Sequence, residues 1–147
     1  MDAFFKYLNI LPMPVWIGMM FAPDHRLTER ASRSSTVFII AALNYLVALL
    51  LSIRGTRRNG EQIPLDFTSL EGVRKGLGTR EGTTGAWAHM LALDLFVGAW
   101  IYRQARALNA PAPIRVVSIL FAMMAGPVGL LIFLLWRIFG AGRPEQL

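Results

Sequence analysis

Four apolar stretches, each about as long as a bilayer crossing, dominate the sequence and cover residues 4–22, 37–53, 86–102 and 116–136. A helix needs about 20 apolar residues to cross the ~30 Å hydrocarbon core of a membrane. Charged residues make up 16% of the chain, against ~25% in an average soluble domain, which disfavours the alternative of a soluble bundle with very hydrophobic helices. The sequence therefore predicts an all-α integral membrane protein, a single domain over residues 1–147 built as a four-helix bundle.

The composition also limits the chemistry that the chain can carry. Cysteine is absent, so disulfides and thiolate metal sites are excluded. His25 and His89 lie in different segments, and no carboxylate spacing completes a ligand set, so no metal is expected. We find no glycine-rich phosphate loop or nucleophile elbow and expect no cofactor. The net charge of +6 indicates loops that face anionic membrane lipid, and we expect no binding of nucleic acid.

Prolines interrupt two of the expected spans. Pro12 and Pro14 lie inside the first, which predicts either a kink supported by neighbouring helices or a helix that begins at Pro12. Pro127 lies near the middle of the fourth, where it removes a backbone hydrogen bond and bends the helix. Gly126 and Gly129 each follow an alanine four residues earlier, a spacing that lets a neighbouring backbone approach closely. We expect one kinked crossing with a concave wall.

The loop between the second and third spans carries the stretch "TSLEGVRKGL". Thr68 and Glu71 match a capping box, and the apolar residues after them fall on one face, which predicts a short amphipathic helix on the membrane surface. Nine basic residues, Arg143 of the C-terminal tail among them, fall on one side of the expected topology and six on the other. The positive-inside rule then predicts that both termini are cytoplasmic. The absence of a transit peptide favours a bacterial inner membrane.

The third span, "AWAHMLALDLFVGAW", carries a carboxylate near its centre. Asp94 is the ninth of the seventeen residues from 86 to 102, and an acid near the bilayer midplane costs ~2.5–3.5 kcal/mol on insertion scales. It should therefore face the protein interior and be paired or protonated. Trp87 and Gly98 share its helix face. Asn44, at a matching depth in the second span, is the expected hydrogen-bond partner, and the neighbouring Tyr45 is a further donor.

Two interpretations of this polar group remain open. In the first, Asp94 and Asn44 clamp two helices together and His89 caps a backbone carbonyl. In the second, Asp94 and His89 handle a proton or hold a polar group of a lipophilic ligand, as intramembrane ionisable residues often do. A transporter or proton channel is disfavoured, because one midplane acid provides no continuous relay.

Three stretches in order, "FTSLEGVRKGLG", "AWAHMLALDLFVGAWIY" and "GPVGLLIFLLWR", resemble the neoxanthin-synthase-like family of small plant and bacterial membrane proteins. With the earlier "LPMPVWIGMMFAP" the resemblance covers about residues 11–137. It implies a four-helix membrane protein connected with carotenoids. The plant members are tied to the conversion of violaxanthin to neoxanthin, an isomerisation that opens an epoxide and leaves an allene and a hydroxyl group.

The implied reaction needs one proton delivered to oxygen and another removed from carbon, without a cofactor. For this reaction a protonated Asp94 is the candidate acid and His89 the candidate base of a carotenoid isomerase. A carotenoid is about as long as the ~30 Å hydrocarbon core and would lie in a groove between spans. The alternative is a non-catalytic carotenoid-binding or assembly subunit of a pigment–protein complex. The candidate ligand contacts are Asn44, Tyr45, Trp87, Gly98, Gly126, Pro127 and Gly129.

Overall fold

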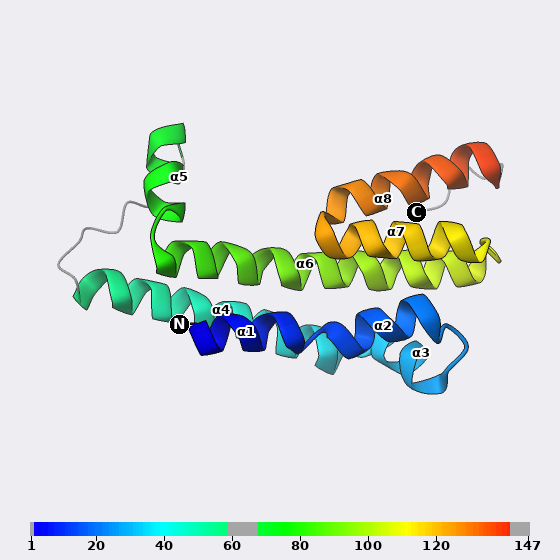
Figure 1. Ribbon diagram of the computed structural model, residues 1–147, viewed down its shortest axis with the longest axis horizontal. Coiled ribbons are helices and arrows are strands. Elements are labelled where there is room, and N and C mark those ends of the chain that lie inside the picture. The colour runs from blue at the N-terminus through cyan, green and yellow to red at the C-terminus, as the bar shows by residue number, and fades with distance from the viewer. Residues whose placement is uncertain (1, 59–67, 142–147) are drawn as a thin grey trace. The chain divides into compact units, whose positions relative to one another are not determined.

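The computed structural model describes residues 2–58 and 68–141, and these residues form helices joined by short turns (Figure 1). In chain order the helices are α1 (Asp2–Ile10), α2 (Met13–Phe21), α3 (Arg26–Arg33), α4 (Ser35–Arg58), α5 (Leu70–Leu77), α6 (Arg80–Ala107), α7 (Ala112–Met124), α8 (Gly126–Leu135) and the π-helix η1 (Trp136–Gly140). The predicted all-α class is confirmed. Within the described residues, three stretches are long and apolar enough to cross a membrane: Asp2–Phe21, Ser35–Arg54 and Arg80–Ala107. Arg143 of the basic tail lies outside the described residues.

The chain divides into two compact units. Unit 1 contains residues 1–11 and 39–92, and unit 2 contains residues 12–38 and 93–147. Helices α4 and α6 each contribute to both units, and α6 passes from one to the other between Ala92 and Leu93. The expected second and third spans are therefore present as α4 and α6, each longer than its apolar stretch.

Unit 1 is held together by a small core between α1, α4 and the first part of α6. Leu8, Ala48 and Ala88 are buried at its centre, and the two alanines let the helix backbones approach closely. At the start of α6 the guanidinium of Arg80 donates to the carboxylate of Asp2 at 2.7 Å. Both side chains are at least 75% exposed, so this ion pair contributes little to stability.

The two prolines of the first span divide it into two helices. α1 ends at Ile10, and the carbonyl of Pro12 accepts hydrogen bonds from the N–H groups of Val15 and Trp16 at 3.0 and 3.2 Å. Pro12 is thus the N-cap of α2, and Pro14 lies in the first turn, where a missing N–H has no helical partner to lose. Of the two expectations for this span, the structure has the helix that begins at Pro12.

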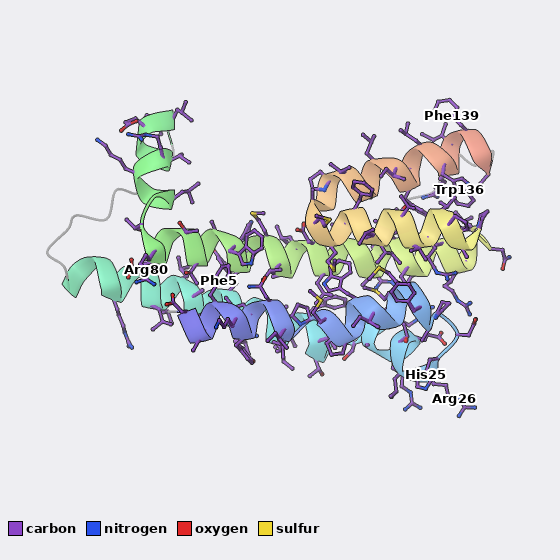
Figure 2. All side chains as sticks on the ribbon, viewed as in Figure 1. Phe5, His25, Arg26, Arg80, Trp136 and Phe139 are labelled. Carbon is purple, nitrogen blue, oxygen red and sulfur yellow. The ribbon has the colours of Figure 1, made fainter. Side chains whose placement is uncertain are left out.

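Helix α3 in unit 2 was not expected from the sequence. His25 caps it, because its Nδ1 accepts a hydrogen bond from the N–H of Leu27 at 3.2 Å. Its buried face consists of Thr28 and Ser32, and Arg103 of α6 donates to the backbone carbonyl of Ser32. The arginines of α3 remain on the outside. Figure 2 shows His25 and Arg26 at the outer edge of this short helix.

The expected single crossing over residues 116–136 is instead two helices. α7 ends at Met124, Ala125 is extended with φ −159° and ψ 86°, and α8 begins at Gly126. Figure 1 shows α8 turning back to lie beside α7. The 13 residues of α7 rise only about 20 Å, less than the ~30 Å that a crossing needs. The prediction of one kinked span is wrong here, because Pro127 starts a new helix in place of bending an old one.

The two helices of this hairpin approach each other through Gly129. A Cβ added at Gly129 would lie 2.2 Å from the backbone nitrogen of Ala122 and 2.3 Å from the carbonyl oxygen of Ser118. The glycine therefore allows the two backbones to meet within the hairpin itself. The ring of Phe133 in α8 also meets Trp100 of α6 edge to face, with 5.8 Å between ring centroids.

The expected short helix of the middle loop is α5, but its cap differs from the prediction. The hydroxyl of Ser69, not of Thr68, accepts the hydrogen bond from the N–H of Gly72 at 3.1 Å. Glu71 binds Arg74 through two hydrogen bonds of 2.9 Å, so its carboxylate is paired with a residue one turn further along the helix. Leu70 is 87% exposed, as expected of an apolar side chain available to a membrane surface.

Candidate functional site

The carboxylate of Asp94 is bound to the turn of the α7–α8 hairpin. Asp94 is the fifteenth of the 28 residues of α6, and it accepts a hydrogen bond from the backbone N–H of Gly126. The contact is close enough that a Cβ on Gly126 would lie 2.1 Å from the carboxylate oxygen Oδ1. Only a glycine at position 126 leaves room for this approach.

The start of α8 explains why a carboxylate is needed there. The first N–H groups of a helix have no partner within it, and Ala125 at the N-cap position has no side-chain oxygen to offer. Pro127 has no N–H, and the N–H groups of Val128 and Gly129 are directed to the carbonyl of Ala125 at 2.8 and 3.4 Å. The N–H of Gly126 is the remaining donor, and Asp94 accepts it.

Asp94 therefore acts as an N-cap supplied by another helix. A side-chain oxygen at this position usually stabilises a helix by about 1 kcal/mol, and the partial positive charge of a helix N-terminus favours a carboxylate nearby. In hydrocarbon an unsatisfied N–H costs several kcal/mol, so this one hydrogen bond matters more than it would in water. The acid in the apolar run of α6 thus has a structural partner.

The space beside Gly98, one turn further along α6, is filled by an aromatic ring. A Cβ at Gly98 would lie 2.2 Å from Cζ3 of Trp16, and Trp16 is only 1% exposed. Gly98 thus allows α2 to place its indole ring against the backbone of α6. Of the other expected ligand contacts in unit 2, Gly126 and Gly129 allow the close contacts of the α7–α8 hairpin described above. Pro127 is exposed.

The remaining candidate residues belong to unit 1. His89 is exposed and its ring meets that of Tyr45 edge to face, with 5.2 Å between centroids. The amide of Asn44 donates to the carbonyl of Ile40 in its own helix at 2.9 Å. Asn44 belongs to unit 1 and Asp94 to unit 2, so their expected pairing stays a prediction.

Trp87 takes part in a polar contact that the sequence reasoning missed. Its indole Nε1 donates to Oδ1 of Asn9 at 3.0 Å, and the amide of Asn9 donates to the carbonyl of Phe5 at 2.8 Å. The rings of Phe5 and Trp87 lie 5.9 Å apart, and Figure 2 marks Phe5 on α1. An asparagine in the first apolar run was the signal that could have indicated this contact.

Among residues 2–58 and 68–141 no group of three or more histidine, aspartate or glutamate side chains is arranged to hold a metal ion. The chemistry that these residues offer is therefore that of a carboxylate at a helix start in unit 2 and of an exposed imidazole beside a phenol in unit 1. A carboxylate and an imidazole are both groups that can take part in acid–base chemistry.

Comparison with known proteins gives one family. The profile of the family described as ABA DEFICIENT 4-like matches residues 3–133. The protein ABA DEFICIENT 4, chloroplastic, of Arabidopsis thaliana is 27% identical over 96 residues, which are 61% of this chain and 41% of that relative. The match thus spans less than half of the relative's length. No solved structure matches significantly.

Proposed function

Because the chain belongs to the ABA DEFICIENT 4-like family, we propose that it is a membrane protein that acts on a carotenoid. The finer proposal is a cofactor-independent isomerase whose substrate is an epoxy- or oxygenated carotenoid. Family membership supports the ligand class, and the resemblance to neoxanthin-synthase-like proteins supports the reaction type. The position of a proton-exchanging group, Asp94, at the centre of an apolar helix is the observation that carries the catalytic part.

The proposed reaction conserves mass and electrons. A proton is delivered to the epoxide oxygen as its bond to carbon breaks, which leaves a hydroxyl group. A second proton is removed from a carbon of the adjoining polyene, and its electron pair forms the new double bond of the allene. Asp94 is the proposed acid and His89 the proposed base. After one reaction Asp94 has lost a proton and His89 has gained one, so the enzyme is restored when His89 releases its proton to solvent and Asp94 takes one up.

Asp94→Asn is the sharpest test, because asparagine and aspartate are about equally good N-caps. The substituted asparagine can still accept the hydrogen bond of Gly126 through its amide oxygen, but it cannot exchange a proton at neutral pH. The experiment compares pigments, by liquid chromatography and mass spectrometry, from a host that makes epoxy-carotenoids and carries the wild-type protein, the variant or neither. An isomer of unchanged mass that appears with the wild type and is lost in a folded Asp94→Asn variant supports the isomerase.

The second candidate is a non-catalytic carotenoid-binding or assembly subunit of a pigment–protein complex. The hydrogen bond from Gly126 favours it, because capping α8 already accounts for an acid at this depth. Under this proposal the host pigments stay unchanged, while a carotenoid co-purifies with both the wild type and Asp94→Asn. If no carotenoid is altered or retained by the purified protein, both candidates are wrong.

The proposed location is a bacterial inner membrane, with three crossings and one hairpin. The expectation that both termini are cytoplasmic depended on four crossings. If Asp2–Phe21, α4 and α6 each cross once, and the α7–α8 hairpin enters and leaves through the same face, the two ends of the chain lie on opposite faces. Cysteine labelling from each face of the membrane tests this topology.

A further inference from the structure

The open end of the α7–α8 hairpin, opposite its turn, carries two arginines with unused hydrogen-bond donors. Arg115 lies in the first turn of α7, and Arg137 lies in η1 directly after α8. The Nε atoms of both are buried and have no hydrogen-bond partner among the described residues. Arg137 as a whole is only 4% exposed, and a buried guanidinium without an anion is costly.

The register of the hairpin brings these two residues to the same level. Gly129 lies against Ala122 and Ser118. The two helices run in opposite directions, and Arg137 is eight residues after Gly129. The residues of α7 at the same level therefore lie about eight residues before those that contact Gly129, in the first turn of α7. Arg137 therefore lies level with the first turn of α7, which contains Arg115. Ser118, whose buried hydroxyl is the third unpartnered polar atom, is one turn deeper along α7.

The acidic residues of the described part of unit 2 already have partners other than Arg115 and Arg137. Asp24 binds Arg106, Glu29 pairs with Arg33 at 3.6 Å, and Asp94 caps α8. Against these three acids the same part of the unit has seven arginines and no lysine: Arg26, Arg30, Arg33, Arg103, Arg106, Arg115 and Arg137. Arginine presents a planar fork of donors that matches a phosphate group in two-point contact, which a lysine ammonium does not.

The surroundings of the two arginines resemble a membrane interface. Figure 2 shows Trp136 and Phe139 at the end of the hairpin away from its turn, and Phe139 is 81% exposed. Tryptophan is enriched at the headgroup level of membranes. Exposed apolar side chains beside two arginines whose Nε donors have no partner among the described residues suit a molecule with a phosphate head and acyl chains better than a free ion.

We propose that Arg115 and Arg137 form a binding site for the phosphate group of an anionic phospholipid. The phosphate oxygens accept hydrogen bonds from the two guanidinium groups and supply a negative charge that the described residues at this end of unit 2 do not provide. The acyl chains extend along the apolar face that includes Phe139. This site is separate from the proposed carotenoid chemistry and does not depend on it.

The test measures thermal unfolding of the full chain in maltoside micelles with added phosphatidylglycerol, phosphatidylcholine or inorganic phosphate. Phosphatidylglycerol is expected to raise the melting temperature in a concentration-dependent way, since a ligand that binds only the folded state stabilises it. Arg115→Gln and Arg137→Gln are each expected to weaken the apparent affinity by about tenfold or more, because each removes a charge-assisted contact to phosphate. Arg30→Gln, which makes the same charge change on α3, serves as the matched control.

A further readout separates lipid binding from a purely structural role. Without lipid, Arg137→Gln should be at least as stable as the wild type, because it removes a buried charge that no described residue compensates. If Arg115→Gln does not fold, Arg115→Lys is expected to fold and to bind phosphatidylglycerol more weakly than the wild type, because it keeps the charge but loses the fork.

Three results would overturn the proposal. Equal weakening by Arg30→Gln would mean diffuse attraction to charge and no site. Equal stabilisation by phosphatidylcholine would remove the requirement for an anionic lipid. Equal stabilisation by inorganic phosphate at the same concentration would assign the two arginines to a free ion and not to a lipid.

Discussion

Replacement of Gly129 by alanine tests whether α7 and α8 form a tightly packed hairpin. The added Cβ would lie 2.2 Å from the nitrogen of Ala122, and ordinary contacts begin near 3.4 Å, so the two backbones must separate by about 1.2 Å. Overpacking of this kind costs about 1–3 kcal/mol. The obstacle is backbone and not a flexible side chain, so we expect a cost near 3 kcal/mol at this position.

Alanine also favours the helix by about 1 kcal/mol relative to glycine, so the expected net loss of unfolding free energy for Gly129→Ala is about 2 kcal/mol. Gly85→Ala in α6 is the matched control, because a Cβ there would meet no atom within 4 Å. It should gain up to about 1 kcal/mol from helix propensity alone.

The measurement is equilibrium unfolding of both variants and the wild type in mixed micelles of dodecyl sulfate and dodecyl maltoside. A difference of about 3 kcal/mol between the two variants is expected from the terms above. If Gly129→Ala is as stable as Gly85→Ala, the close approach of α7 and α8 at this glycine is refuted, and with it the account of the hairpin.

Three further predictions concern the cap, the topology and α5. Asp94→Ala leaves a helix-start N–H without an acceptor and should lower the unfolding free energy by about 1–3 kcal/mol, whereas Asp94→Asn should stay within about 0.5 kcal/mol of the wild type in the same micelle assay. Single cysteines can be introduced directly, since the chain has none. A membrane-impermeant maleimide should label Leu27→Cys and Ala141→Cys from one face and Lys75→Cys from the other, and labelling of positions 75 and 141 from the same face would restore the fourth crossing. Hydrogen bonds from its arginine partner hold the pKa of Glu71 below the ordinary value, so the pair supports α5 at neutral pH and this support is lost as the pH falls through the lowered pKa. The protection factors of the α5 amides, which correct for the slower intrinsic exchange at low pH, should fall on acidification in the wild type, and a Glu71→Gln variant that showed the same fall would contradict this.

The long helices could be predicted from the sequence because their apolar length leaves few alternatives. The runs in α4 and α6 are too long and too apolar for a soluble domain of this size, and only helices satisfy their own backbone in lipid. Both helices are longer than expected, since α4 begins at Ser35 and α6 extends from Arg80 to Ala107. Polar residues at a helix end do not need to enter the hydrocarbon, so they can continue the helix beyond its apolar run. Helix α3 was missed because it is short and polar, so apolar periodicity gave no signal.

The hairpin could not be distinguished from a crossing by apolarity alone. A single span and a re-entrant pair of short helices both bury an apolar segment of about 20 residues. Pro127 was read as a kink in a continuous helix, although proline is equally typical of the first turn of a new one. The decisive information is the acceptor for the N–H of Gly126, and that acceptor, Asp94, is 32 residues earlier in the chain.

The same contact gives an order to the assembly of the protein in its membrane. A chain is synthesised from its N-terminus, so α6 with its carboxylate is available before the turn that requires it. The backbone N–H of that turn would be unsatisfied in lipid on its own. The last helices are therefore more stable in hydrocarbon against an α6 that is already inserted, and a chain with a defect in α6 should leave its C-terminal segment more exposed to proteases and quality control.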